Sequence, residues 1–487
     1  MEMKEKDNFK EQMVKKVEKI IQAGIEPYGR KFERGLPIKS LIENFKDGNE
    51  TKIAGRIRAI RSHGKSIFAD VEDESGKIQI YAKKDILGQE KFILFQLLDV
   101  GDFIGLTGKL FKTHVGEITA EISSFIPLSK ALLPLPEKWH GLKDVEARYR
   151  QRYLDLIVNT KVREVFYKRS IIVNKIREFL NARGFLEVET PILQPVPGGA
   201  AGRPFKTHHN EFDCDLYLRI APELYLKRLL VGGFEKVYEL GRNFRNEGVS
   251  RRHNPEFTML EVYEAYADYN DMMNLTEELF IYLAKQLFGG ETKFEYKGKE
   301  INLKRPFKRI SFAQALGLDP KEKDLKTWKK ILKDRFGVDI KAGVSRSQIA
   351  KVAEELLSPH GEGGEQPTFI IDYFSELSPL AKTKKDNPSL IERFELFVGG
   401  MEIANAYSEL NDSVEQRQRF TEQSREETKQ TKDEDFIKAL EYGMPPAGGL
   451  GIGIDRLVML FTNQDSIRDV LLFPQLRPIE QKAEDRE

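Results

Sequence analysis

The sequence predicts an α+β fold in which a small N-terminal β-barrel precedes a larger domain built on an antiparallel sheet. Five short segments between residues 51 and 126 show the period-two alternation of half-buried strands, with turn residues between several of them. Beyond residue 145, candidate strands at 236–247 and 257–269 are joined by a short loop, and no regular strand–helix alternation is present. A long hairpin without that alternation favours an antiparallel sheet.

Residues 1–50 form the first predicted segment, a helical lead-in to the barrel. A lysine-rich helix is expected over 3–23, because apolar residues recur there at helical spacing. The stripe consists of Met13, Val14, Val17, Ile20 and Ile21. Such a helix either packs this stripe on the body of the protein or lies near an RNA backbone, and the sequence leaves both open.

The barrel domain is predicted over 51–130. Its candidate strands are 51–61, 66–73, 77–82, 102–111 and 117–126, with a helical stretch at 85–99. Three strands, a helix and two strands is the order of an OB-fold barrel, a common carrier of single-stranded nucleic acid.

A linker is predicted over 131–150, where Pro134-Leu135-Pro136 interrupts regular structure. The second domain then spans 151–487. Its final residues, 479–487, are polar and are expected to fray.

The composition places the chain among soluble globular proteins. Of its 487 residues, 40% are apolar and 32% are charged. A single cysteine, Cys214, excludes an internal disulfide and indicates a reducing compartment, so we expect a cytoplasmic protein. There is no secretory signal and no run of about 20 apolar residues, so no membrane contact is expected. The net charge of +1 implies that any RNA contact is local.

The predicted hairpin carries polar and charged residues at strand periodicity. On the second strand one face holds Phe257, Met259, Glu261 and Tyr263. On the first strand a shared face is expected for Asn243, Arg245 and Glu247. The alternative is a solvated hairpin with surface ion pairs, but Phe257 and Met259 favour burial beside the charges.

Acidic residues interrupt the otherwise apolar segment 393–412. Glu395, Glu402 and Glu409 need partners if they are buried, since an unpaired buried charge costs several kcal/mol. Asn405, Tyr407 and Glu409 alternate on one strand face, whereas Glu402 joins that face only if a β-bulge intervenes. Two carboxylates are suitable ligands for Mg²⁺, although this spacing alone is weak evidence for a metal.

The segment 448–460 is predicted to be a glycine-rich strand that runs into a helix. Its glycines, Gly451 among them, allow a flat ligand to approach the backbone. Arg456 falls in the first helical turn, where its guanidinium can bind phosphate. Glycine-rich turns before helices are common, so this segment is informative only with the other two.

Together these segments resemble the motifs of class II aminoacyl-tRNA synthetases, and those of the lysyl-tRNA synthetase family in particular. FRNEG followed by RHNPEFTMLE resembles motif 2, GIGIDR resembles motif 3, and GFLEVETPIL at 184–193 resembles the end of motif 1. The lysine-specific likeness lies in RIAPELYLKRL, PLAK and RFELFVGGMEIANAYSELND. The resemblance covers nearly the whole chain. It implies activation of L-lysine with ATP, transfer to the 3′ end of tRNA(Lys), and a homodimer built through motif 1.

The resemblance also implies the roles of individual residues. Arg245 and Arg456 would be catalytic, Arg245 bridging the lysine carboxylate and the ATP α-phosphate. The other predicted ATP ligands are Glu247, His253, Asn254, Phe257, Glu395, Glu402 and Gly451. Glu395 and Glu402 would hold Mg²⁺, and Phe257 would stack on adenine.

The same resemblance assigns the lysine pocket. Glu223 and the backbone of Gly199 would hold the α-amino group, and Glu409 with Tyr263 would hold the ε-ammonium. Glu261, Asn405 and Tyr407 would shape the rest of the pocket. Tyr407 departs from the phenylalanine expected in many relatives, and its hydroxyl needs a partner.

For the barrel, the resemblance implies an anticodon site of Arg61, Phe68, Gln79 and Glu117. The residues themselves support it, because Arg56, Arg58 and Lys65 also lie near Phe68 in the sequence and supply cations beside a stacking ring. The alternative is a solvated strand with Phe68 in the core.

Three rival functions remain at this point. Synthetases for aspartate or asparagine share the architecture but need a cation in the pocket, whereas this pocket is rich in glutamate. A relative that lysylates a protein would typically lack the N-terminal barrel. A non-catalytic RNA-binding paralogue would not need Arg245, Glu395, Glu402 and Arg456.

Overall fold

The computed structural model describes residues 3–136, 144–200, 202–319, 321–322, 324–341, 344–360, 365–426 and 433–478. The chain divides into two compact units, Met1–Lys143 and Asp144–Glu487, and each is described by itself. Part of the predicted linker, 137–143, and the predicted frayed end, 479–487, lie outside the described residues.

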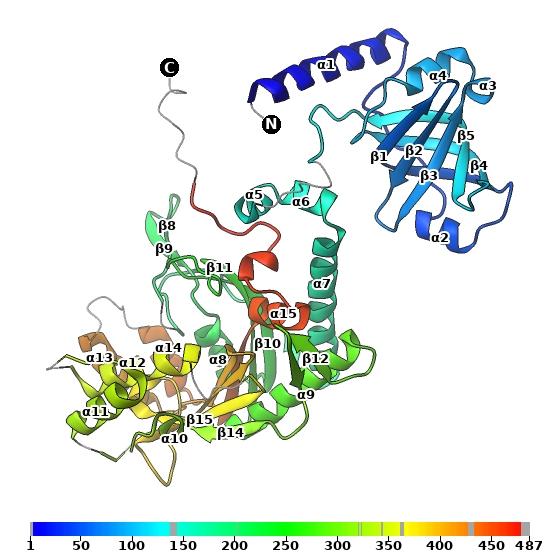
Figure 1. Ribbon diagram of the computed structural model, residues 1–487. Helices are drawn as coiled ribbons and strands as arrows, with labels where there is room; N and C mark the ends of the chain where they lie inside the picture. The colour runs from blue at the N-terminus through cyan, green and yellow to red at the C-terminus, as the bar shows by residue number, and fades with distance from the viewer. Residues whose placement is uncertain are drawn as a thin grey trace. The chain divides into compact units, whose positions relative to one another are not determined.

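The first unit is a five-stranded closed barrel with helices at its N-terminal end and between its third and fourth strands (Figure 1). Its elements are α1 (Met3–Gln22), α2 (Ile38–Glu43), β1 (Glu50–His63), β2 (Ser66–Glu72), β3 (Lys77–Lys83), α3 (Lys84–Leu87), α4 (Gln89–Phe95), β4 (Phe103–Lys112) and β5 (Ile118–Ser129). The strand order β1-β2-β3-β5-β4 confirms the predicted OB-fold. The predicted helical stretch is two short helices, because Gly88 separates them at φ +81°.

Helix α1 packs on the barrel through part of its predicted stripe. Ile20 belongs to the barrel core, and Met13 is also buried. Val14 and Ile21 are 40% and 56% exposed, so the stripe is narrower than predicted. Lys16 adds an ion pair of 2.6 Å with Asp99 of the barrel. These contacts favour the packing interpretation of this helix.

The second unit is built on an eight-stranded sheet in the order β14-β15-β16-β17-β18-β11-β10-β6. These strands are β6 (Leu186–Glu187), β10 (Lys236–Phe244), β11 (Glu256–Ala265), β14 (Lys308–Ser311), β15 (Thr368–Phe374), β16 (Leu390–Val398), β17 (Met401–Ser408) and β18 (Ala447–Gly453). The six strands from β15 to β10 pair antiparallel, as predicted. The two edge pairs, β14–β15 and β10–β6, are parallel, so the sheet is mixed.

Helices and smaller sheets surround this sheet. The helices are α5 (Val145–Arg150), α6 (Arg152–Val158), α7 (Thr160–Asn181), α8 (Glu223–Val231), α9 (Tyr269–Leu287), α10 (Phe312–Leu316), α11 (Leu325–Phe336), α12 (Arg346–His360), α13 (Ser413–Glu426), α14 (Glu434–Glu441) and α15 (Ile454–Thr462). The minor strands are β7 (Leu193–Gln194), β8 (Lys206–His209), β9 (Cys214–Leu218), β12 (Lys293–Tyr296) and β13 (Lys299–Asn302). No helix in the described ranges has the length and hydropathy of a membrane span.

The central strands separate apolar from polar residues by their alternation. Leu260, Val262, Ala406, Leu450 and Ile452 point to one face and form a core with residues of α7, α9 and α15. Figure 1 shows these helices beside the sheet. The alternate residues of the same strands point to the opposite face, which is the polar one. The sheet therefore has one face that stabilises the fold and one that is available for chemistry.

Candidate active site

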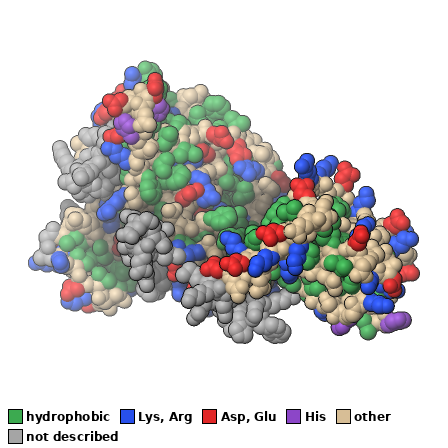
Figure 2. All heavy atoms as spheres, turned by 90° about the horizontal axis from the view of Figure 1, so that it is seen from above, with side chains coloured by type: hydrophobic (Ala, Val, Ile, Leu, Met, Phe, Trp, Pro, Cys, Tyr) green, Lys and Arg blue, Asp and Glu red, His purple; other side chains and the backbone are tan. Residues whose placement is uncertain are grey.

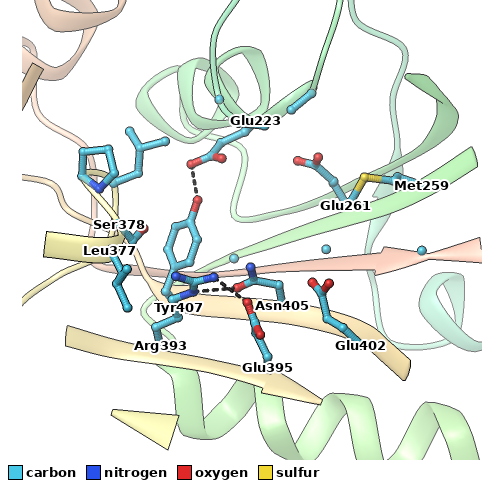
Figure 3. A pocket seen from close by; sticks show the side chains of 18 of the residues that line it. Glu223, Met259, Glu261, Leu377, Ser378, Arg393, Glu395, Glu402, Asn405 and Tyr407 are labelled. Carbon is cyan, nitrogen blue, oxygen red and sulfur yellow. Dashed lines mark hydrogen bonds and ion pairs between the residues drawn. The ribbon is translucent and has the colours of Figure 1, made fainter. Parts of the chain in front are cut away.

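Two rows of side chains cross the polar face of the sheet. Strand register aligns Glu261 of β11, Gly451 of β18, Asn405 of β17 and Glu395 of β16 in the first row. The second row consists of Tyr263, Gly449, Tyr407 and Arg393 on the same four strands. These rows line a cavity of about 1040 Å³. Figure 3 shows several of the side chains converging there.

Glu402 reaches this face through a β-bulge. Leu396 pairs with Ala404, but the next residue, Phe397, pairs with Glu402, so Ile403 is the extra residue. The bulge on which this placement of Glu402 depended is thus present, and Glu402 lies beside Glu395 (Figure 3). Arg456 in the first turn of α15 donates from Nη1 to the Glu402 carboxylate at 3.0 Å and to its carbonyl at 2.8 Å.

A buried charge cluster closes the end of the cavity beside α8. Lys227 Nζ lies 2.7 Å from Glu223 Oε1 and also forms an ion pair with Glu409. The Tyr407 hydroxyl donates to Glu223 Oε1 at 2.6 Å, which supplies the partner that this hydroxyl needs (Figure 3). Gly449 is required here, because a Cβ at that position would collide with Glu409 and lie 2.7 Å from Tyr263 Cε1.

Glu261 is the acid of this pocket that lacks a cation. It is 5% exposed and forms no ion pair with any described residue. Its one side-chain hydrogen bond comes from the Tyr263 hydroxyl at 3.1 Å. Burial, reinforced by the nearby Glu223, raises the pKa of Glu261 to about 8. A positively charged ligand placed here would restore the ionised carboxylate.

Gly199 faces Glu223 across the cavity wall. Its φ of +84° favours glycine, and a Cβ there would lie 3.0 Å from Glu223 Cβ. Glu223 Oε2, unlike Oε1, makes no hydrogen bond within the described part of the chain. This oxygen and the Gly199 backbone are therefore available to a ligand together.

The predicted first strand of the hairpin is too long. β10 ends at Phe244, so Arg245 and Glu247 lie in the loop that follows rather than on a strand face with Asn243. The loop closes through a 2.8 Å hydrogen bond from the Arg245 amide to the Pro255 carbonyl. β11 likewise ends at Ala265 rather than at residue 269, because Tyr266 adopts φ +62° and Asp268 caps α9.

The Arg245 side chain nevertheless reaches the cavity. Its guanidinium carbon lies 5.2 Å from the centre of the Phe257 ring. Its Nε is buried without a partner, and no described side chain forms an ion pair with it. Burial lowers the pKa of Arg245, and the nearby Glu247, Glu402 and Glu261 oppose this shift. A buried guanidinium without an anion is suited to bind a carboxylate or phosphate.

The remaining predicted nucleotide residues differ in how they are engaged. His253 Nε2 lies 3.1 Å from Arg456 Nη2, and burial and Arg456 lower the pKa of His253, so it is neutral. Asn254 lines the cavity, but its side chain is bonded to the Glu256 carbonyl and the Gln475 amide. Asn254 therefore fixes the loop, while Glu247 stays exposed at the cavity rim.

The partners of the buried acids were not predicted from the sequence. Arg393 Nη2 donates to Glu395 Oε1 at 2.6 Å and pairs with Glu354 of α12 at 3.0 Å. Tyr373 donates to Glu395 Oε2 at 2.9 Å. Arg393 could have been found from its period-two spacing to Glu395. Lys227 could likewise have been found as a lysine four residues after Glu223 in an apolar helix.

The barrel residues predicted for the anticodon are close together on one surface. Phe68 is half-buried and stacks on Tyr81 at 4.6 Å between ring centroids, and Tyr81 lies 6.2 Å from Phe111. Gln79 Nε2 donates to Glu117 Oε2 at 3.1 Å. Arg61, opposite Phe68 in the strand register, pairs with Asp70 at 2.9 Å. Tyr81 on β3 and Phe111 on β4 were not predicted, although both are aromatic residues of the predicted barrel strands.

Basic and acidic side chains are interspersed over the face seen in Figure 2. This mixture agrees with the net charge of +1. It leaves local features, such as the aromatic row of the barrel, to carry any nucleic-acid contact.

Comparisons with known proteins identify the same two parts. A family model described as tRNA synthetases class II (D, K and N) matches residues 144–477, and an OB-fold nucleic acid binding domain model matches 51–128. A lysine–tRNA ligase of Carboxydothermus hydrogenoformans is 56% identical over 98% of this chain and 100% of the relative. The lysine–tRNA ligase of Pelotomaculum thermopropionicum is 55% identical over 96% of this chain and 94% of the relative. The lysine–tRNA ligase of Thermotoga maritima is 50% identical over 98% of this chain and 98% of the relative. These matches confirm the resemblance read from the motifs, and the chain belongs to the lysine–tRNA ligase family of class II tRNA synthetases.

Proposed function

We propose that this protein uses ATP to activate L-lysine as lysyl-adenylate and then transfers the lysyl group to the 3′ end of tRNA(Lys). The observation that carries the proposal is the placement of charge in the cavity. Buried carboxylates gather at one end, and an unpaired guanidinium, Arg245, lies in the same cavity. That distribution complements an amino acid with a cationic side chain and an anionic carboxylate.

In the proposed complex the substrate spans these charges. Its ε-ammonium lies at Glu409 and Tyr263, and its α-ammonium at Glu223 Oε2, Glu261 and the Gly199 backbone. Its carboxylate meets Arg245. Asn405 and Tyr407 form the floor between the two ends. A neutral side chain would leave buried carboxylates unpaired, which strongly disfavours its binding.

Adenylate formation needs placement and charge neutralisation rather than a general base. The lysine carboxylate is already ionised at neutral pH. Arg245 would hold it in line with the α-phosphorus and share the charge that develops as pyrophosphate leaves. Arg456, which His253 and Glu402 fix at the other end of the cavity, would bind the phosphate chain or the adenine face. Phe257 and the Gly451 backbone would contact the nucleotide.

In the second step a terminal hydroxyl of tRNA attacks the activated carbonyl, and AMP leaves. The new ester bond replaces the mixed anhydride, so no further energy source is needed. By family likeness the hydroxyl is the 3′ one.

Glu395 and Glu402 fit a magnesium ion. They lie side by side, and burial and the neighbouring Glu402 raise the pKa of Glu395 to about 8, a repulsion that a cation would relieve. Glu402 Oε1 has no hydrogen-bond partner among the described residues. No cluster of three or more His, Cys, Asp or Glu side chains suited to a metal occurs in the described chain, so phosphate oxygens and water would complete the shell. When bound, Mg²⁺ supplies positive charge to the phosphate oxygens.

The barrel is the proposed anticodon reader. Phe68, with Tyr81 and Phe111, offers ring faces for unstacked bases. Arg61, Gln79 and Glu117 surround these rings with polar groups for base edges.

We propose a homodimer built through α7 and the segment after it, in the cytoplasm where tRNA is charged. Exposed apolar side chains gather there, and they suit a protein interface. They are Tyr167, Ile171, Leu186, Ile192 and Leu193.

The proposal is tested by amino-acid-dependent exchange of pyrophosphate into ATP, run with each of the twenty amino acids. Lysine alone should support rapid exchange, and added tRNA(Lys) should then accept lysine. Comparable exchange with aspartate or asparagine would overturn the assignment, and exchange with none would indicate a non-catalytic protein.

A further inference from the structure

A lysine of the protein itself lies behind the acidic end of the cavity, bonded to two of the carboxylates that line it. The side chain of Lys227 is fully buried in the helix α8. Its Nζ is held by Glu223 from one turn earlier and by Glu409 just after β17, and it lies 5.5 Å from the Tyr407 ring centroid. Burying an ammonium is costly unless it is paired, so two carboxylates are committed to this one cation.

The pairing constrains what remains for a substrate. Glu223 Oε1 already accepts hydrogen bonds from Lys227 and from Tyr407. The carboxylate is thereby fixed with Oε2 beside Gly199. A Cβ placed on Gly199 would lie 3.7 Å from this oxygen. Glu409 is held on its other side by the close approach of Gly449. Lys227 thus orients both acids that the proposed function assigns to the two ammonium groups of lysine.

The charges support the same conclusion. Glu223, Glu261 and Glu409 carry three negative charges when ionised, and Lys227 carries one positive charge. The remaining two negative charges match the α- and ε-ammonium groups of lysine, while Arg245 meets the substrate carboxylate. Without Lys227, a third negative charge would stay uncompensated in a buried site, and the cluster would instead retain a proton.

We propose that Lys227 is a positioning and specificity-determining residue. Its internal ammonium orients Glu223 and Glu409 and offsets one of their negative charges, which leaves the pocket suited to a diammonium substrate. This inference rests on the proposed function. Lys227 does not touch the reacting atoms, so its loss weakens lysine binding and leaves ATP binding in place.

Several titratable groups surround Lys227 and enter any test by pH. They are Glu223 on α8, Glu261 and Tyr263 on β11, Tyr407 and Glu409 at the end of β17, and the Arg219–Glu239 pair beyond Glu261. On the opposite side of α8, Arg228 pairs with Asp433 and Asp435 near α14. Only the carboxylates bonded to Lys227 change their partner when it is replaced.

The test compares Lys227→Met with Lys227→Arg in lysine-dependent pyrophosphate exchange between pH 6.5 and 9. Lys227→Met should raise KM for lysine at least tenfold at pH 7 and change KM for ATP less than twofold. The defect should shrink as pH rises, because the retained proton is released. Lys227→Arg keeps the charge and should restore the wild-type pH profile. A defect that is independent of pH and equal for lysine and ATP would overturn the inference.

A second variant covers the case in which Lys227→Met does not fold. Lys227→Met with Glu409→Gln removes a cation and an anion together, so no unpaired buried charge remains. If Lys227→Met folds, the KM of the double variant for lysine at pH 7 should be no higher than the KM of Lys227→Met. If Lys227→Met does not fold, the KM of the double variant should lie within threefold of the KM of Glu409→Gln. An affinity loss equal to the product of two independent defects would overturn the inference. Failure of the wild-type protein to exchange with lysine would instead overturn the proposed function.

Discussion

The unpaired acid Glu261 predicts that lysine binding releases a proton. Burial raises the pKa of Glu261 to about 8, so in the empty cavity at pH 6.5 this group is mostly the neutral acid. An ammonium binds the carboxylate and not the acid. Lysine must therefore displace the proton, and its affinity should rise as pH increases toward 8.

The magnitude follows from the pKa. Each pH unit below the pKa of a group that must ionise costs about 1.4 kcal/mol, a factor of ten. For one acid with a pKa of about 8, the apparent Kd for lysine should be roughly fifteenfold higher at pH 6.5 than at pH 8. The ammonium groups of lysine remain mostly charged over this interval, so the substrate adds little to the slope.

Calorimetric titration in buffers of different ionisation enthalpy measures both quantities. Near pH 7 the heat should report proton release on lysine binding, of which Glu261 supplies close to one proton for each lysine bound. Burial also raises the pKa of Glu409 to about 8, so this second acid adds to the release. Glu261→Gln is the matched control: it should bind lysine more weakly and release about one proton fewer. A wild-type Kd that changes less than twofold from pH 6.5 to 8 would show that Glu261 need not ionise for lysine to bind. An undiminished release in Glu261→Gln would assign the proton to another carboxylate.

The same pKa has a consequence for stability. Glu261 ionises near pH 4.5 in the unfolded chain and near 8 in the folded one, so the folded state binds more protons between these values. Its contribution to the free energy of unfolding therefore falls as pH rises from about 4.5 to 8. Because lysine binds more tightly at pH 8, a fixed lysine concentration should raise Tm more there than at pH 6.5.

Three further predictions concern separate parts of the molecule. Gly449→Ala should reduce lysine-dependent exchange at least tenfold, because the added Cβ would collide with Glu409. Overpacking of this kind costs about 1–3 kcal/mol. Unchanged exchange would show that Glu409 can move aside without loss of lysine binding. Phe68→Ala should lower kcat/KM for tRNA charging by about five- to a hundredfold without affecting pyrophosphate exchange, since stacking one base is worth roughly 1–3 kcal/mol. A much lower Tm or a parallel loss of exchange would identify Phe68 as a structural residue. Sedimentation should show a dimer that Ile171→Glu on the exposed face of α7 converts to monomers, and a fully active wild-type monomer would contradict the proposed interface.

Much of the fold could be predicted because its signals are local. The five barrel strands and the central hairpin follow from alternation and turn residues. The parity of Glu402 relative to Asn405 showed that the two share a face only if a bulge intervenes, and the structure has that bulge at Ile403. The errors occurred where local signals stop. Strand β10 ends at Phe244 because the loop beyond it is closed by the Arg245–Pro255 hydrogen bond, which alternation does not encode.

The site was less predictable because buried charges are paired across the chain. Lys227 and Glu409 are far apart in sequence, as are Glu354 and Arg393, so only the folded chain shows these partners. The family resemblance named the acids of the pocket but not the cation that balances them. The likeness also placed Asn254 among the nucleotide ligands. Its side chain lines the cavity and is bonded to backbone groups of Glu256 and Gln475, so its contact with the nucleotide stays a prediction.

If buried carboxylates select the cationic side chain of lysine, the pocket should reject norleucine. Norleucine keeps the four side-chain carbons of lysine and lacks only the ε-ammonium, so a pocket that recognises shape would accept it. A site that must pair its buried polar groups rejects an analogue lacking the partner by about 10⁴-fold or more. In pyrophosphate exchange the ratio of kcat/KM for lysine over norleucine should therefore reach about 10⁴. A ratio below about ten, which apolar contacts alone can produce, would show that the pocket selects its substrate by shape and not by charge.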